Sequence, residues 1–276
     1  ANPILVEIDE NFHINIVDFI AKANASKSKF LLLSHMRGHI TNMDKLVEIC
    51  KSLKIQIIED CAHTMGAKWD GKRSGNFGLV SAFSTQTYKH INSGEGGFLV
   101  TNDDEVIAKA IMHSGSYMLY EKHASLPNND IFEKVKLKTA NFSGRMDNLR
   151  SSILIPQLKD LDNKVIMWNN LYKELYDRLK TQDGIFIPNR DKREFYVGSS
   201  IQFRLKDFAD KKIQDFIKNC KKRGVDLKWF GDKNPNAYTS RYDSWEYLEN
   251  IPVLKNTLEI LKTTLDMRIP LTFDNN

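Results

Sequence analysis

An aspartate, a serine and a lysine follow one another through residues 55–97 in an order that could do cofactor chemistry. Asp60 ends one apolar segment, Ser84 ends a second, and Lys89 follows soon after. A lysine amine can bond to an aldehyde, and burial that lowers its pKa makes it nucleophilic. A carboxylate can face a protonated pyridine nitrogen, and a hydroxyl can donate to a phosphate. The three side chains could therefore hold a phosphorylated aldehyde cofactor.

The surroundings of these residues strengthen that interpretation. Lys89 precedes a glycine-rich segment, 94–97, where the backbone can pass close to a ligand. His63 could lie against a cofactor ring or orient Asp60. Each residue also has a structural alternative: a surface lysine, an aspartate that caps the next helix, a turn serine and a buried structural histidine.

The elements that must position these side chains alternate between strand and helix. The apolar patterns predict strands at 4–8, 30–34, 55–58 and 98–101, and helices at 43–53 and 103–112. Alternation of this kind indicates an α/β fold with a mostly parallel sheet. Ligands of such sheets bind beyond the carboxyl ends of the strands, where Asp60 and Ser84 stand.

The remainder of the chain follows another pattern. Residues 117–137 are typical of a polar loop, and 149–179 of a long amphipathic helix that Pro156 should kink. A strand at 199–205, a helix at 211–223 and an aromatic-rich tail follow. We predict part of a large domain at 1–145, a bridging helix at 146–180 and a small α+β domain at 181–276.

Composition argues against several classes of protein. The net charge of +5 is spread along the chain, and the basic cluster 218–223 is more typical of a solvated helix face than of a nucleic-acid site. Cys50, Cys61 and Cys220 are widely spaced, which argues for a reducing compartment and against disulfides or zinc. No apolar run approaches the ~20 residues of a membrane span, and the first residues do not resemble a signal peptide. We expect a cytoplasmic location.

Three further patterns have competing explanations. Residues 66–72 nearly spell a phosphate-binding P-loop, but Arg73 replaces the required Ser or Thr, and Asp70-Gly71 is more typical of a hairpin turn. His35 and His39 have metal-pair spacing without an acid between them, so we expect no zinc there. We expect a cluster of aromatic residues to form the core of the small domain, with some of its members lining the mouth of a substrate pocket. The cluster comprises Trp229, Phe230, Tyr238, Tyr242, Trp245 and Tyr247.

Longer stretches resemble the DegT/DnrJ/EryC1/StrS family of fold-type-I pyridoxal phosphate (PLP) enzymes, most of which are sugar aminotransferases. The segments that carry the resemblance are LLLSHMRGHITNMDKL, EDCAH, NFGLVSAFSTQTYK, INSGEGGFLVTND, SGRMDNLRSSILIPQLKDLD, KKRGVDLKWF and DMRIPL. They extend over nearly the whole chain. The resemblance implies the fold-type-I architecture, a large domain followed by a small C-terminal one.

The resemblance also implies a role for each candidate residue. Lys89 would bond to PLP and carry the proton, Asp60 would pair with the pyridinium, His63 would lie near the ring or its phenolic oxygen, and Ser84 would bind the phosphate. Related sugar dehydratases carry histidine in place of the lysine. Here Lys89 holds that position and His90 is its neighbour, which favours amino transfer.

The implied activity is transfer of an amino group, from glutamate by family habit, to a keto group of a nucleotide-linked sugar by a homodimer. The alternatives are a PLP-dependent sugar dehydratase and a non-catalytic binding or regulatory relative. Members of the family usually carry a further N-terminal segment with a phosphate loop and an aromatic residue that stacks on the cofactor. We expect those parts to lie outside residues 1–276. The family's asparagine that reaches across the dimer corresponds to Ser143, with Asn141 nearby, and either could make that contact.

Overall fold

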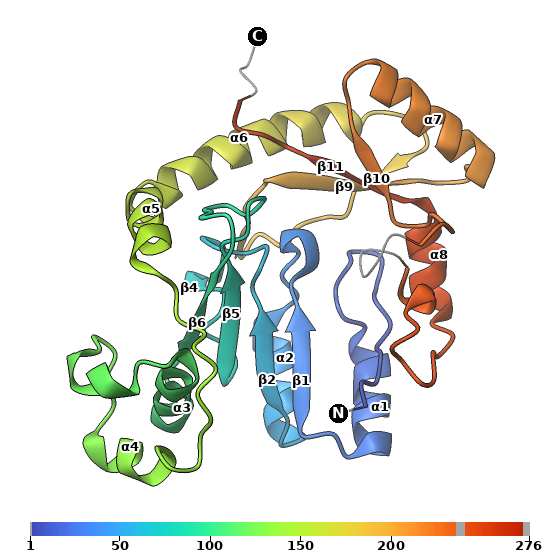
Figure 1. Cartoon of the computed structure of the whole chain (residues 1–276). Coiled ribbons are helices and arrows are strands. Elements are labelled where there is room, and N and C mark those ends of the chain that lie inside the picture. The colour runs from blue at the N-terminus through green and yellow to red at the C-terminus, as the bar shows by residue number, and fades with distance from the viewer. Residues whose placement is uncertain (1, 236–240, 273–276) are drawn as a thin grey trace. The chain divides into compact units, whose positions relative to one another are not determined.

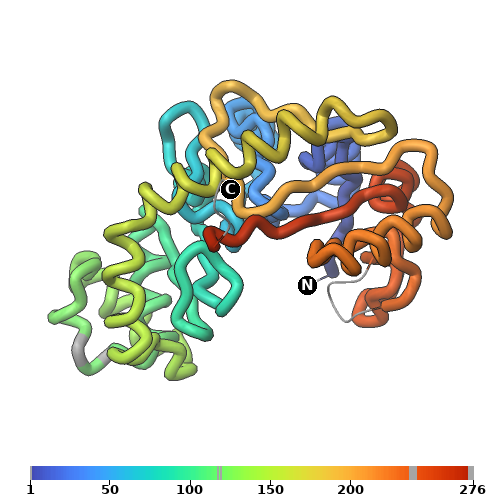
Figure 2. Tube along the Cα trace, turned by 90° about the horizontal axis from the view of Figure 1, so that it is seen from above, coloured from blue at the N-terminus to red at the C-terminus, as the bar shows by residue number. Residues whose placement is uncertain are grey.

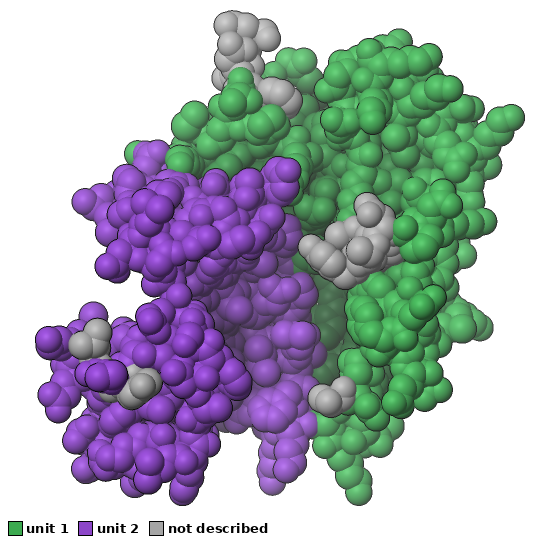
Figure 3. Space-filling view, in the orientation of Figure 1, with its two compact units in different colours: residues 1–28, 36–41, 163–276 green, residues 29–35, 42–162 purple. Residues whose placement is uncertain are grey.

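The chain forms two compact units, shown in different colours in Figure 3. The computed structural model describes residues 2–235 and 241–272, except for the side chains of 117 and 119. Unit 1 comprises 1–28, 36–41 and 163–276, and unit 2 comprises 29–35 and 42–162. Residues 36–41 therefore belong to unit 1 although their neighbours on both sides belong to unit 2. The three domains predicted from the sequence remain a prediction.

Unit 2 is built on a four-stranded sheet in the order β1-β2-β5-β6 (Figure 1). The strands β1 (Phe30–Ser34), β2 (Gln56–Asp60) and β5 (Val80–Ser84) are parallel, and β6 (Gly97–Thr101) runs antiparallel to β5. The sheet is therefore mostly parallel, which confirms the predicted α/β class. Asp60 and Ser84 stand at strand ends, as the sequence predicted.

Helices α2 (Met43–Ser52) and α3 (Asp104–Ser114) begin at side-chain caps. The Asn42 side chain accepts a hydrogen bond from the backbone N of Lys45. The Asp103 side chain accepts one from the backbone N of Val106. Such caps satisfy backbone N–H groups that have no partner within the helix. Helix α2 buries Met43, Leu46 and Cys50, the apolar stripe of the predicted helix 43–53.

Residues 68–73 form a hairpin of β3 (Lys68–Trp69) and β4 (Lys72–Arg73). Its two central residues, Asp70 and Gly71, have φ of 46° and 78°. Two successive positive φ angles are the geometry of a type I′ turn. The hairpin expected at Asp70-Gly71 is thus confirmed.

The prediction of a loop throughout 117–137 was wrong. This segment contains a 3-10 helix, η2 (Tyr117–Lys122), and helix α4 (Asn129–Val135), which the side chain of Asn128 caps. Tyr120 is only 3% exposed; its ring stacks on Phe132 at 3.8 Å between centroids. A buried aromatic pair thus organises a segment whose overall polarity suggested a loop.

The strand predicted at 4–8 was also wrong, since only an isolated bridge joins Ile8 to Ile14. Glu7 O accepts from the backbone N of Asn15, and other backbone groups of this segment bond to side chains. Glu7 N donates to Asp18, and Ile8 N donates to Thr257 Oγ1 at 3.0 Å. Thr257 in turn donates from its backbone N to the Glu7 carboxylate at 2.7 Å. These bonds anchor the segment without a strand partner.

The predicted helix 149–179 is two helices, α5 (Asn148–Lys159) and α6 (Leu161–Leu179). The break comes at Asp160, whose φ and ψ of −97° and 1° leave the helical region. Pro156 lies inside α5 rather than at the break. Its missing N–H removes one helical hydrogen bond, and the chain leaves the helix one turn later.

Unit 1 is built on an antiparallel sheet in the order β10-β11-β9-β7. Figure 2 shows β9 and β11 running side by side. The strands are β7 (Ile185–Phe186), β9 (Ser200–Leu205), β10 (Leu227–Trp229) and β11 (Thr264–Arg268). The unit also contains α6 from residue 163 on, and the elements α1 (Ile16–Ser26), η1 (Met36–Gly38), β8 (Glu194–Phe195), α7 (Asp210–Lys222), η3 (Tyr242–Ser244) and α8 (Lys255–Thr263). The strand at 199–205 and the helix at 211–223 are confirmed within one residue.

The aromatic cluster of the sequence prediction is only partly core. Trp229 and Tyr242 are buried, whereas Tyr247 is 69% exposed. Tyr238 lies outside the described residues.

The fully buried carboxylate of Glu59 connects several parts of unit 2. Its Oε1 accepts from the backbone N of Phe77 and Gly78 at 2.7 and 2.8 Å, and its Oε2 accepts from Gly75 N at 3.0 Å. His35 Nε2 lies 3.3 Å from Oε2. Burial by itself would raise the pKa of the Glu59 carboxyl. The hydrogen bonds from His35, Gly78 and Gly75 outweigh burial, so the pKa lies below its ordinary value.

Replacing Glu59 by Gln should therefore destabilise the protein by about 2–4 kcal/mol, since buried donors lose a charged acceptor. Urea unfolding followed by circular dichroism measures this change. Glu48→Gln, on the exposed face of α2, is the matched control and should change stability by no more than about 0.5 kcal/mol. Equal stabilities for the two variants would contradict the role given to Glu59.

Candidate functional site

Asp60 stands at the carboxyl edge of the parallel strands, half-buried and held from two sides. Ser34, the last residue of β1 and its partner in register, donates from Oγ to Asp60 Oδ2 at 2.9 Å. The backbone N of Ala62 donates to Oδ1 at 3.1 Å. Both oxygens of the carboxylate are thus held in a fixed orientation.

The charge of Asp60 remains available to a ligand. Within the described part of the chain it forms these two hydrogen bonds and no ion pair, because both donors are neutral. A half-buried carboxylate with no ion-pair partner among the described residues can pair with a cation from outside, such as a protonated pyridine nitrogen.

Lys89 and His63 lie in direct contact. Nζ of Lys89 is 3.2 Å from Nε2 of His63, and both side chains are half-buried. His63 follows the end of β2, and Lys89 lies in the loop between β5 and β6. The structure therefore brings together two of the four predicted residues, from segments that the sequence separates.

The loop that carries Lys89 folds back on itself. Thr85 N donates to Gly96 O and Thr87 N to Gly94 O, each at 2.9 Å. Gly94 and Gly96 have φ of 85° and 133°, which glycine adopts without strain. The glycines after Lys89 thus close the loop that holds it.

Ser84 ends β5, the strand next to β2. Its Oγ accepts from Gln86 N at 3.2 Å, which orients the oxygen while its own proton can still be donated. In register, Ala82 of the same strand lies opposite Asp60. Asp60 and Ser84 therefore come from the same edge of the sheet.

Ser34 and Glu59 were missed by the sequence reasoning. Ser34 ends an apolar strand just as Asp60 and Ser84 do, so that common signal could have revealed it. Glu59 had no such signal, because its partners are backbone groups sixteen to nineteen residues away.

His90, the neighbour of Lys89, is buried. Burial, together with the nearby charge of Lys89, lowers its pKa to about 4, so the ring is neutral at pH 7. Ser143 and Asn141 are exposed, and Asn141 Oδ1 accepts from Ser143 N at 2.7 Å within a local turn. Which of these two contacts a partner subunit stays a prediction.

His35, Glu59 and Cys61 offer three potential metal-ligand atoms within 4.8 Å of one another. The Glu59 oxygens already accept three backbone hydrogens. Burial raises the pKa of the Cys61 thiol to about 12, so it stays protonated. His39, the other half of the considered metal pair, bonds to Gln202 instead, at 2.6 Å. We assign no metal to these groups.

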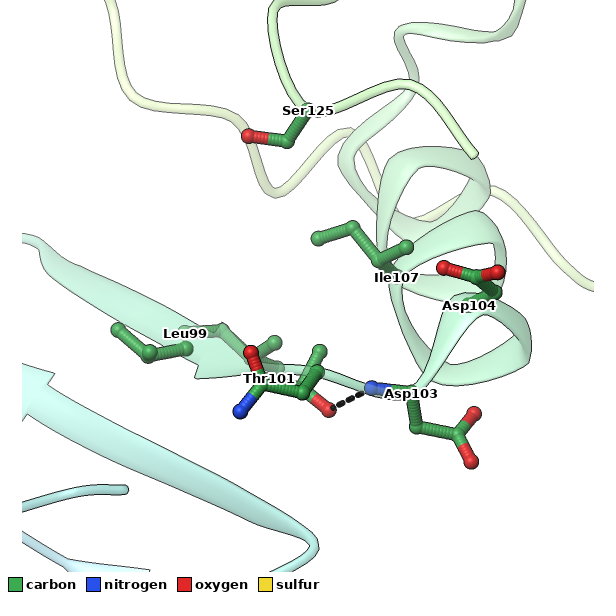
Figure 4. A pocket seen from close by; sticks show the side chains of 8 residues that line it. Leu99, Thr101, Asp103, Asp104, Ile107 and Ser125 are labelled. Atoms are coloured by element: carbon green, nitrogen blue, oxygen red, sulfur yellow. Dashed lines mark hydrogen bonds between the residues drawn. The ribbon is translucent and has the colours of Figure 1, made fainter. Parts of the chain in front are cut away.

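A separate pocket of about 410 Å³ lies where β6 ends and α3 begins (Figure 4). Its lining includes Leu99, Thr101, Asp103, Ile107 and Ser125. Thr101 Oγ1 accepts from Asp103 N, and Asp103 caps α3, so these polar groups are used within the fold. None of the four predicted site residues lines this pocket.

A model of the DegT/DnrJ/EryC1/StrS aminotransferase family matches residues 1–269. GDP-perosamine synthase of Escherichia coli O157:H7 is 32% identical over 164 residues, which cover 59% of this chain and 42% of that protein. EpsN of Bacillus subtilis (strain 168), a putative pyridoxal phosphate-dependent aminotransferase, is 28% identical over 172 residues, covering 61% and 41%. The chain thus spans about half the length, or less, of the curated relatives it matches.

Among solved structures, the E coli GDP-4-keto-6-deoxy-D-mannose-3-dehydratase with bound hydrated PLP has a TM-score of 0.77 at 22% identity. The similarity covers 96% of this chain and 69% of that one. It confirms the predicted PLP-dependent transferase fold. Among the residues described, no helix is both long and apolar enough to cross a membrane.

His90 should make stability depend on pH. Its folded pKa of about 4 lies below the ordinary 6.5, so between these values only the unfolded chain binds the proton. Stability should therefore fall as pH drops from 6.5 to 4, by roughly 3 kcal/mol from this group. His90→Gln should remove that part of the slope in urea titrations at several pH values, and His123→Gln should keep it. An unchanged slope in His90→Gln would show that another group is responsible.

Proposed function

Because the chain belongs to the DegT/DnrJ/EryC1/StrS aminotransferase family, we propose that the protein is a PLP-dependent aminotransferase acting on a nucleotide-linked sugar. The amino donor in this proposal is glutamate. The names of the two relatives, a GDP-perosamine synthase and a PLP-dependent aminotransferase, support it. The observation that carries it is the contact of Lys89 Nζ with His63 beside the edge where Asp60 and Ser84 end their strands.

The residues present fit the cofactor. A carboxylate free of ion pairs among the described residues suits a pyridinium, a serine hydroxyl suits a phosphate, and a half-buried lysine suits an aldehyde. When bound, PLP supplies an aldehyde that bonds to amines and a ring that accepts an electron pair.

Lys89 provides the amine that anchors the cofactor and then moves a proton at Nζ. A lysine can take this role only when it is unprotonated. His63 Nε2, at 3.2 Å, is within hydrogen-bond reach and can accept a proton from Nζ or return one. The pair thus combines a nucleophile with a neighbouring base.

Asp60 keeps a negative charge at a fixed position throughout the reaction. Ser34 and Ala62 orient its two oxygens, so little reorganisation is needed when positive charge arrives opposite it. Ser84 would donate a hydrogen bond from its hydroxyl to the phosphate of bound PLP and so help to hold it.

Two other functions compete with the proposed aminotransferase. One is that of a PLP-dependent sugar dehydratase, and the other is that of a binding or regulatory protein without catalytic activity. Lys89 argues against the dehydratase, because histidine takes that position in the dehydratases. A non-catalytic relative would have no need for the contact between Lys89 and His63.

We further propose a cytoplasmic homodimer. Cys50, Cys61 and Cys220 are free thiols, which suits a reducing compartment. Leu137, Phe142 and Leu149 are 91%, 72% and 72% exposed, and large exposed apolar side chains are typical of a surface that a second subunit covers.

Lys89→Ala should abolish the visible absorbance band that PLP acquires when a lysine bonds to its aldehyde, because no other amine occupies that position. The band is recorded after adding PLP to the whole protein. Lys51→Ala, at the exposed end of α2, is the matched control and should keep the band. Absence of the band from the unmodified protein would overturn the enzyme proposal. A band accompanied by deoxygenation of a keto sugar, without amino transfer, would favour the dehydratase.

Asp60→Asn should still bind PLP but lose amino transfer by at least about a hundredfold, since the pyridine nitrogen loses its charged partner. Turnover is measured with glutamate and a nucleotide-linked keto sugar, and PLP content is measured by absorbance. Ser34→Ala, which keeps the carboxylate but removes one hydrogen bond to it, should have a smaller effect. Near-normal turnover of Asp60→Asn would mean that another acid faces the ring.

A further inference from the structure

Helix α7 turns a row of lysines outward from unit 1. Lys211, Lys218 and Lys222 are all exposed, and the last two follow the first by seven and eleven positions. At 3.6 residues per turn, these spacings bring the three side chains onto one side of the helix. This lysine stripe extends roughly 16 Å along the helix axis. Three charges in a straight row can reach one flat surface together.

The opposite side of α7 is used within unit 1. Ile213 is fully buried, and Phe216 and Ile217 are half-buried. The helix packs against β10 (Figure 1). A partner from outside therefore meets α7 only through its charged side.

The lysine stripe lacks the acidic partners that exposed cations have on another helix of this unit. On α6, Lys173 contacts Asp177 and Arg178 contacts Glu174, each pair four positions apart. Among the described residues, no ion pair includes a lysine of the stripe. Asp215 is the one acid on the same side of α7, and it forms no ion pair there either.

The positions of these lysines oppose the stability of the helix. Lys211 lies in the first turn, where the helix dipole disfavours positive charge. Lys218 and Lys222 are four positions apart, so their like charges repel. The dipole favours Lys222 in the last turn, but it explains neither Lys211 nor the repulsion. A face that only needed to be soluble could carry paired charges, as α6 does. The arrangement suits a surface that supplies negative charge from outside.

The chemistry of the stripe indicates which surface that is. Sites for single-stranded nucleic acid combine cations with aromatic side chains on which bases stack, and protein interfaces centre on aromatic or arginine anchors. The outward side of α7 carries neither, since Gln214 and Asp215 accompany the lysines there. Lysines on the polar side of an amphipathic helix can bind anionic lipid headgroups through charge alone.

We propose that the lysine stripe holds unit 1 against the surface of a bilayer that contains anionic phospholipid. The contact is electrostatic and reversible, because the apolar side of α7 is buried and does not enter the hydrocarbon. The proposal is independent of the proposed function, whose residues Asp60, His63, Ser84 and Lys89 belong to unit 2.

Sedimentation of the whole chain with vesicles tests the contact. Vesicles of phosphatidylcholine with one third phosphatidylglycerol should bind the protein, whereas vesicles of phosphatidylcholine alone should not. Salt at about 0.5 M should release it, since ions screen exposed charges. The triple variant Lys211→Gln, Lys218→Gln, Lys222→Gln should bind at least about thirtyfold more weakly. Circular dichroism checks that this variant keeps its helices.

The matched control is Lys51→Gln, Lys122→Gln, Lys134→Gln, which removes three exposed charges scattered over unit 2. It has the same net charge as the stripe variant but should retain binding. Asp215→Asn should strengthen binding about fivefold, because it removes the one negative charge beside the stripe.

Three results would overturn the proposal. The first is no binding to the anionic vesicles, and the second is equal weakening in the stripe variant and its control. The third is binding of a short single-stranded RNA or of polyglutamate, in preference to the vesicles, that the stripe variant abolishes. Vesicle binding does not require PLP, so a protein with the PLP band and no vesicle binding would contradict this proposal alone.

Discussion

A single buried carboxylate holds together the carboxyl edge of the sheet in unit 2. Glu59 lies one residue before Asp60 on β2, and it accepts backbone hydrogens from 75–78, the segment that leads into β5. It also contacts His35, the residue after Ser34. The ends of β1 and β2 and the approach to β5 are therefore tied to one group. Because Ser34, Asp60 and Ser84 sit at those ends, their spacing depends on a residue that takes no part in the proposed chemistry.

The sequence predicted much of this edge because its signals are local. An apolar run that stops at a polar residue reveals a strand end, which is why Asp60 and Ser84 could be placed before the structure was known. The hairpin turn at Asp70-Gly71 was also predictable from the local sequence, because two successive positive φ angles favour residues such as Asp and Gly. The contact of Lys89 with His63 was not predictable in this way, because it depends on how two loops fold beyond the strands.

The errors arose where the sequence was judged by local pattern alone. The segment 117–137 was judged by its polarity, but the buried stack of Tyr120 on Phe132 organises it into helices. The segment 4–8 was judged by its apolar composition, but side chains distant in the sequence accept hydrogen bonds from its backbone. The helix break at Asp160 lies one turn beyond the proline that suggested it. In the first two cases a tertiary contact decided the outcome rather than local propensity.

The bonds between Glu7 and Thr257 have a consequence for the order in which the chain acquires structure. They join residues 250 positions apart, and the segment around Glu7 has no strand of its own to hold it meanwhile. During synthesis, residues 29–35 and 42–162 can meet their partners while unit 1 still waits for its later segments. Such distant pairings slow folding and leave early segments exposed to wrong associations. Glu7 and Ile8 can therefore complete these bonds only after Thr257 has been made.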